Sequence, residues 1–405
     1  MSLPPAVLLG GGGIAVSAAR SLAASGVRVV ALGTRTDPVR RSRFCAEFVD
    51  LGADAGARER WLEWLGDRAE DAVVLPCNDD GLELVARHRA EIVAFGHRPV
   101  EANDDVVLAM LDKARTYELA SRVGIPIPRS EVVSTPEEAE ALGSELDFPC
   151  ALKPLAAHRF ALHFGAKLFV VERREELRAV LERARALDLE MMVTDIVPGP
   201  DHQHFSYYSY LDERGEPLFH FTKRKLRQYP TRFGFTCYQV TDWNPEVAEL
   251  GLRFFQGIGL RGVGNVEFKR DARDARLKLI ECNHRFTAAN DLVRRSGLDI
   301  PLLAYNRLTG RPGPSMDGYR TGVRMWHPIE DVRALREYRR AGQLTARKWA
   351  RSLLHRQHFP LVRADDPMPT VANLSRRVGG LARAARGGAP RAEGSGPAAP
   401  VVRPG

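Results

Sequence analysis

Short apolar runs alternate with helix-like segments over roughly the first 110 residues, and this alternation limits the fold more than any other feature. The intervening segments are alanine-rich or amphipathic, and the helical pattern at residues 14–25 ends at Gly26. Strands that alternate with helices predict a small parallel α/β domain at residues 1–111. The strand candidates are residues 6–9, 27–32, 48–51 and 72–76.

Four consecutive glycines, residues 10–13, follow the first apolar run and precede a helical pattern. Backbone amides at such a helix start can bind an anion. A dinucleotide-binding turn also needs an acidic residue at the end of the second strand, where this chain has Gly33, Thr34 and Arg35. We therefore favour a tight turn that packs helix on strand, and an NAD-dependent oxidoreductase is the weaker alternative.

The pattern changes after residue 111. Asp112 and Lys113 open an amphipathic helix that ends at Gly124. Strand candidates with short connections then predict an α+β region at residues 112–310, divided into 112–192 and 193–310. These candidates are residues 131–133, 150–153, 166–172, 191–197, 204–211, 217–225, 235–241, 262–270 and 276–283.

The end of the chain is basic. Residues 311–386 predict a helical extension, and residues 387–405 are rich in Gly, Ala and Pro without apolar periodicity, which predicts a disordered tail. Residues 331–405 hold 15 Arg/Lys and 5 Asp/Glu, so their net charge of +10 exceeds the net charge of the whole chain, +8. Because no folded basic stripe with stacking aromatics stands out, we expect no nucleic-acid partner.

Other bulk features agree with a globular enzyme. No apolar run reaches the length of a membrane span, and the N-terminal residues lack a basic leader, so we expect a cytoplasmic protein without a membrane span. The five cysteines are scattered and never spaced as CxxC, which indicates neither a disulfide framework nor a zinc site.

Two neighbouring strands near residue 275 carry the sharpest chemical pattern. Glu267 interrupts an apolar strand, while Glu281 and Asn283 lie two apart on the next and so share one face. If the strands pair, these carboxylate and amide oxygens converge as the hard ligands that magnesium prefers. Arg285 follows, and its planar guanidinium suits phosphate oxygens. The alternative is a polar patch that faces solvent.

Two lysines are candidates for binding phosphate. Lys113 begins a helix, and Lys153 ends an apolar strand immediately before Pro154. The apolar strand at residues 191–199 breaks at Pro-Gly, with Thr194 and Asp195 where the chain leaves it. An exposed backbone edge there can bond an adenine ring.

In this order, the pieces resemble the ATP-grasp superfamily over roughly residues 3–309. The resemblance implies an α/β pre-domain and two α+β subdomains that clasp ATP, followed here by the helical C-terminal extension. It assigns Lys113 and Lys153 to the phosphates, and Arg285 to the reacting acyl phosphate. It places adenine at Thr194, Asp195, Ile196 and Val197, and Mg²⁺ (or Mn²⁺) at Glu267, Glu281 and Asn283.

Residues 221–234 resemble a subgroup of carboxylate-amine ligases similar to D-aspartate ligase. Their basic strand end holds Lys223, Arg224, Lys225 and Arg227, of which Lys225 and Arg224 are the catalytic candidates. A solvated charge run is the alternative. The loop after Pro154 has a single glycine where many relatives have several, so its closure over ATP is an open question.

The function that the resemblance implies is an ADP-forming ligase. A small-molecule carboxylate would attack the γ-phosphate of ATP, and an amine would then displace phosphate from the acyl phosphate. A homodimer is possible. The rival interpretations are an ATP-binding regulatory protein without turnover and the NAD-dependent oxidoreductase.

Overall fold

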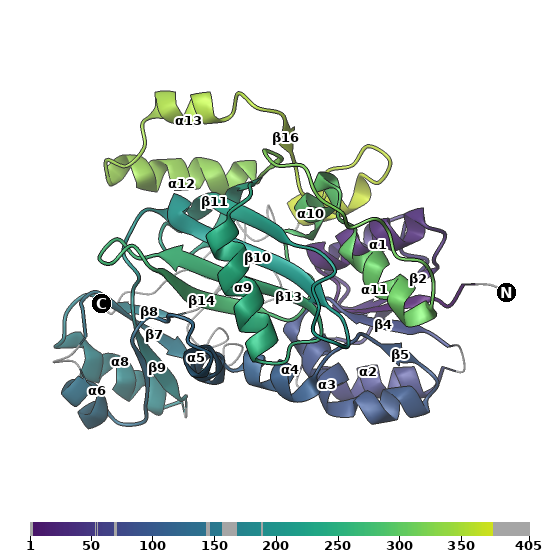
Figure 1. Cartoon of the computed structure of the whole chain (residues 1–405), viewed down its shortest axis with the longest axis horizontal. Helices are drawn as coiled ribbons and strands as arrows, with labels where there is room; N and C mark the ends of the chain where they lie inside the picture. Colours follow the sequence, from purple (N-terminus) through teal and green to yellow (C-terminus); the bar gives the residue numbers. More distant parts are fainter. Residues whose placement is uncertain are drawn as a thin grey trace.

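The computed structural model describes residues 3–375 apart from residues 53, 55, 69, 70, 143–145, 156–167 and 188. In this part of the chain the strands form three sheets, with helices packed on them (Figure 1). The predicted disordered tail, residues 387–405, lies outside the described residues. None of the described helices is long and apolar enough to cross a membrane.

The first sheet has five parallel strands in the order β3-β2-β1-β4-β5, which confirms the predicted parallel α/β region. Its central strands β1 and β4 are buried along their whole length, as continuous apolar runs require when helices cover both faces. The strands are β1 (Ala6–Leu9), β2 (Val29–Gly33), β3 (Glu47–Asp50), β4 (Val73–Pro76) and β5 (Arg98–Pro99). The helices are α1 (Gly13–Ala24), η1 (Pro38–Arg41), α2 (Ala57–Gly66), α3 (Asp79–Ala94) and α4 (Asp104–Leu111).

The glycine turn before α1 is filled by a carboxylate. A Cβ atom on Gly11 would lie 2.3 Å from Oδ2 of Asp37, and the same oxygen accepts a hydrogen bond from the Thr34 amide at 2.8 Å. An acidic side chain there repels a dinucleotide phosphate. The structure therefore favours the tight turn over the oxidoreductase.

The second sheet is antiparallel, in the order β6-β9-β7-β8. Asp112 begins the preceding helix as its N-cap, because its carboxylate accepts from the amides of Ala114 (2.8 Å) and Arg115 (3.1 Å). Gly124, with a φ of +70°, follows the helix end as predicted. The elements are α5 (Lys113–Arg122), β6 (Ser130–Val133), α6 (Pro136–Leu142), β7 (Cys150–Pro154), β8 (Phe169–Val171), α8 (Glu176–Arg185) and β9 (Met191–Asp195).

The third sheet has seven strands in the order β14-β13-β10-β11-β12-β15-β16. The strand expected at residues 217–225 is found as β11, which begins at Phe221. Before it, Pro217 forms only an isolated bridge with Leu211, and Leu218 N donates to Tyr210 O at 2.8 Å. The elements are η2 (Asp201–Gln203), β10 (His204–Leu211), β11 (Phe221–Tyr229), β12 (Phe235–Thr241), α9 (Pro245–Gly257), β13 (Gly262–Arg270) and β14 (Leu277–Asn283).

Helix α9 covers one face of the third sheet (Figure 1). Gly251 allows the close approach, since a Cβ atom there would lie 2.3 Å from Cδ1 of Tyr207 on β10. Phe255 of α9 packs on the same tyrosine ring, with centroids 5.6 Å apart. This face is apolar core, so polar chemistry is left to the opposite face.

The segment after residue 310 is not only helical, contrary to the expected extension. It adds β15 (Arg324–Trp326) and β16 (Gln357–His358) to the third sheet, besides α12 (Pro328–Arg340) and α13 (Ala346–Ser352). Asp331 of α12 is fully buried and accepts from Arg227, Trp326 and Trp349, each at 2.8 Å. These bonds hold both C-terminal helices on the sheet.

Later parts of the chain also return to the first domain. Helices α10 (Asn290–Ser296) and α11 (Ile300–Thr309) pack on α1, where Asn290 donates to Ser17 at 2.9 Å. Asp366 is 1% exposed and accepts from the Nε of Arg20 (2.8 Å) and from Ser42 (2.7 Å). The C-terminal segment is thus tied to the N-terminal domain by a buried ion pair.

We predict that Asp366→Ala lowers the free energy of unfolding by about 3 kcal/mol, because it leaves the buried Arg20 guanidinium without its carboxylate. Asp365→Ala is the matched control, since its carboxylate is exposed and bonds Arg363. Urea unfolding measures both variants. Equal midpoints for the two would show that the buried pair does not hold this segment.

Candidate functional site

The acidic strands pair as predicted. Strands β13 and β14 form an antiparallel hairpin in which Asn265 opposes Asn283 and Glu267 opposes Glu281. Directly opposed residues of an antiparallel pair point to the same face. The three predicted metal ligands therefore share the face opposite α9, although metal binding itself stays a prediction.

Glu267 is held by two basic side chains from neighbouring strands. Its Oε2 lies 3.1 Å from Nζ of Lys225 and 3.0 Å from Nε2 of His204. Burial by itself raises the pKa of Glu267, but Lys225 and His204 outweigh it and hold this pKa well below the usual value. Burial also lowers the pKa of His204 to about 4, so the imidazole is neutral at pH 7. The site thus keeps an ionised carboxylate beside an ammonium.

The predicted ligands are oxygen donors of the kind that magnesium prefers. Opposed carboxylates repel each other across a strand pair, and a cation between them would remove that repulsion. The predicted set has two carboxylates and one amide. The described residues contain no cluster of three or more His, Cys, Asp or Glu side chains that could hold a metal. Magnesium usually takes only one or two carboxylates and completes its shell with water and phosphate oxygens.

Lys153 reaches the metal strand from the second sheet. Its Nζ lies 3.3 Å from the hydroxyl of Tyr117, which donates to the backbone oxygen of Ile280 at 3.1 Å. Ile280 directly precedes Glu281 on β14. The chain's folding therefore places one predicted phosphate lysine beside the predicted metal strand, while Lys113 lies at the first position of α5.

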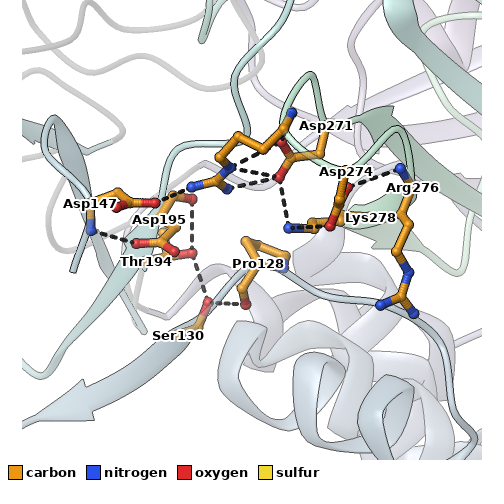
Figure 2. Close-up of polar contacts among 10 residues, drawn as sticks. Pro128, Ser130, Asp147, Thr194, Asp195, Asp271, Asp274, Arg276 and Lys278 are labelled. Carbon is orange, nitrogen blue, oxygen red and sulfur yellow. Dashed lines mark hydrogen bonds and ion pairs between the residues drawn. The ribbon is translucent and has the colours of Figure 1, made fainter. Parts of the chain in front are cut away.

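The predicted adenine segment leaves β9 at the junction of two sheets. Thr194 shares a 2.7 Å hydrogen bond with Ser130 on β6, and the Asp195 carboxylate accepts from the Asp147 amide at 3.4 Å. Burial raises the pKa of Asp195. Beyond β9, Ile196 is partly buried and Val197 buried. Figure 2 shows Thr194 and Asp195 close to the turn between β13 and β14.

An ion-pair network spans this junction (Figure 2). Asp147, beside the adenine segment, pairs with Arg273 of the hairpin turn, and Arg273 also pairs with Asp271 at 2.7 Å. Lys278 joins the same Asp271 carboxylate at 2.7 Å. Arg273 and Lys278 hold the pKa of Asp271 below its usual range, although burial opposes them. The network connects the adenine segment to the hairpin that carries Glu267 and Glu281.

Arg285 is oriented by the first domain. Its Nε lies 2.5 Å from Oδ1 of Asp79, at the start of α3. Although burial opposes it, Asp79 raises the pKa of Arg285. Asn78 is the N-cap of α3 and accepts from the Gly81 amide at 2.8 Å. Asp79, next to this cap, therefore also contacts a predicted site residue.

Arg224 is separated from Lys225. Successive residues of a strand point to opposite faces, so Arg224 points away from the face of Glu267. Its Nε pairs with the Asp242 carboxylate at a distance of 2.9 Å. Its predicted catalytic role is therefore not supported by its placement. Ser206 lies opposite both Glu267 and Lys223, so all three side chains share one face. The alternation of side chains along these strands could have predicted from the sequence that Ser206 and Lys223 lie on the face of Glu267.

The loop after Pro154, with His158, Arg159 and Lys167, lies almost wholly outside the described residues.

Sequence comparison finds D-alanine–D-alanine ligases. The enzyme of Ectopseudomonas mendocina is 28% identical over 183 residues, which cover 43% of this chain and 55% of that enzyme. The chain thus spans about half the length of the curated relatives it matches. No family model matches the chain.

Two groups of solved structures share the fold. Biotin carboxylase from Campylobacter jejuni, solved as a β-γ-ATP complex, matches with a TM-score of 0.61 and 18% identity over 78% of this chain and 74% of that one. N5-carboxyaminoimidazole synthetase from Staphylococcus aureus matches with a TM-score of 0.58 and 15% identity over 78% and 79%. Together with the sequence relatives, they agree with the predicted resemblance to the ATP-grasp superfamily. They do not distinguish the subgroup similar to D-aspartate ligase.

We predict that Lys153→Met weakens ATP binding by roughly 10- to 100-fold, the loss of one charge-assisted hydrogen bond. Lys348→Met, on the exposed surface of α13, is the control and should bind ATP as the wild type does. Calorimetric titration with ATP and MgCl₂ measures both affinities. An unchanged affinity of Lys153→Met would remove this lysine from the nucleotide site.

Proposed function

We propose that the chain is an ATP-dependent ligase that activates a carboxylate as an acyl phosphate and joins it to an amine, with ADP and phosphate as products. The observation that carries the proposal is the pair of opposed carboxylates, Glu267 and Glu281, on a strand that Lys153 reaches through Tyr117 and that Arg285 closely follows. In this proposal, these groups act on the terminal phosphoryl group of ATP. The D-alanine–D-alanine ligase relatives agree with this chemistry.

In this proposal each residue acts by position and charge. Phosphoryl transfer needs little covalent help, so its rate depends on orientation and on neutralising charge. Lys153 and Lys113 bind phosphate oxygens, while Arg285, oriented by Asp79, binds the acyl phosphate. Glu267, Glu281 and Asn283 hold Mg²⁺ or Mn²⁺, which would neutralise phosphate charge when bound. Adenine bonds the backbone of residues 194–197.

Lys225 is the second catalytic candidate. It is 7% exposed, and its pairing with Glu267 orients the ammonium toward the face where the phosphoryl group would lie. Its strand belongs to residues 221–234, the segment that resembles D-aspartate ligase. We assign the chain to that subgroup on this segment, with small-molecule carboxylate and amine substrates and a homodimer as the assembly.

A screen of amino acids against small carboxylates for ADP release tests the activity. Binding of ATP without ADP release from any pair would favour the regulatory alternative. A change in nicotinamide fluorescence when the cofactor is titrated with the protein would favour the oxidoreductase.

We predict that Glu281→Gln loses turnover while its melting temperature stays unchanged or rises, because the substitution removes a charge directly opposite Glu267. Glu246→Gln, on the α9 side, is the matched control and should retain turnover. ADP release and thermal unfolding measure both variants. Normal turnover by Glu281→Gln would contradict the metal assignment.

The bond that breaks in ATP is open to a direct test. With an oxygen-18-labelled carboxylate substrate, one labelled oxygen should move into inorganic phosphate, because the acyl phosphate forms through a carboxylate oxygen. Mass spectrometry of the products measures the transfer. AMP and pyrophosphate as products, with the label in AMP, would refute the acyl-phosphate route even for an active enzyme.

A further inference from the structure

Four side chains form a row across the third sheet. Glu281 opposes Glu267, Glu267 opposes Ser206, and Ser206 opposes Lys223. All four therefore lie on the same face, on strands spaced about 4.8 Å apart. The row begins at the predicted metal ligands and ends at a lysine that the proposed function has not used.

The Lys223 side chain is buried and has no counterion among the described residues. Lys223 is 3% exposed, and its ammonium forms no ion pair with a described residue. Its one described contact is the ring of Tyr208, with Nζ 5.9 Å from the centroid. Burial lowers its pKa to about 8, although Glu267 opposes the shift, so the group is still mostly protonated at pH 7. A buried, unpaired charge is unfavourable unless a ligand neutralises it.

The neighbouring charges do not balance it. Lys225 is in contact with Glu267, and His204 is neutral at pH 7. Lys269 is also buried, which lowers its pKa, and the Asp201 carboxylate opposes this shift. Lys223 and Lys269 are thus the two cations on this face for which no ion pair is found among the described residues, and Lys223 is the one that lies opposite Ser206.

Ser206 supplies a second, independent observation. It is 1% exposed, and its hydroxyl has no hydrogen-bond partner among the described residues. Buried hydroxyls normally have such a partner, and an unsatisfied one destabilises the fold. The unpartnered hydroxyl lies directly opposite the unpartnered ammonium, so one ligand can satisfy both.

We propose that Lys223 and Ser206 bind the carboxylate group that the enzyme activates. The inference rests on the proposed function and identifies the residues that select its carboxylate substrate. One ammonium and one hydroxyl match the single charge and two oxygens of a carboxylate. Glu267 lies next along the row and disfavours a more highly charged group, such as sulfate or phosphate, at the same position.

The use of lysine on this face agrees with the proposal. The chain has eight lysines, and the other 51 of its 59 basic residues are arginine. Three of the eight, Lys223, Lys225 and Lys269, lie buried on this one face. A compact ammonium, unlike a guanidinium, suits a small enclosed anion subsite.

Kinetics of two variants test the subsite. Lys223→Met should raise the KM for the carboxylate roughly tenfold or more and leave the Kd for ATP within about twofold. Ser206→Ala should raise that KM several-fold with an unchanged or higher melting temperature, because an unsatisfied hydroxyl is removed. Arg270→Gln, which loses a surface pair with Glu246, is the control with wild-type kinetics. An unchanged KM in both site variants, or a lower melting temperature of Ser206→Ala, would overturn the proposal.

A binding measurement works without the natural substrate. Eight lysines allow ¹³C-lysine labelling, and the Lys223 resonance is assigned by its loss in Lys223→Met. Acetate should shift this resonance saturably and raise its titration midpoint, with weaker binding in Ser206→Ala. Sulfate that binds at least as tightly as acetate, or no shift with acetate, would refute the carboxylate subsite. Lack of ADP release by the wild type would refute the proposed function instead, and the titration would still test Lys223.

Discussion

The register of β10 between β11 and β13 is the constraint on which the rest of the site depends. Main-chain hydrogen bonds place Ser206 opposite both Glu267 and Lys223, although these residues are far apart in the sequence. A shift by one residue would turn each of these side chains to the face covered by α9, where Tyr207 and Phe255 pack. Packing of α9 therefore fixes which side chains lie on the opposite face, where the nucleotide site is proposed.

Buried charge on that face is organised around Glu267. Its contact with Lys225 keeps one carboxylate ionised and one ammonium in position, while His204 stays neutral because burial lowers its pKa. Such groups destabilise a fold unless they are paired, so an uncompensated one indicates a place where a ligand supplies the missing charge. The same argument connects the opposed glutamates to a cation and Lys223 to an anion.

Longer connections set how the three sheets meet. Arg273 links the β13–β14 turn to Asp147 beside the proposed adenine segment, and Arg285 links the end of β14 to Asp79 of the first domain. Asp331 and Asp366 hold the C-terminal segment on the third sheet and on the first domain. Any change in the angle between the sheets must therefore alter contacts of residues close to the proposed nucleotide site.

Local patterns in the sequence determined the parallel α/β domain, the Asp112 cap and the hairpin of Glu267, Glu281 and Asn283. These depend on strand alternation and on capping over a few residues, which can be read from neighbouring positions. Only the tertiary structure decided that Arg224 faces away, that Asp79 orients Arg285, and that the C-terminal segment adds two strands to a sheet. Each of these depends on pairing between segments distant in sequence, and the partner of a strand is set by long-range packing and not by its own residues.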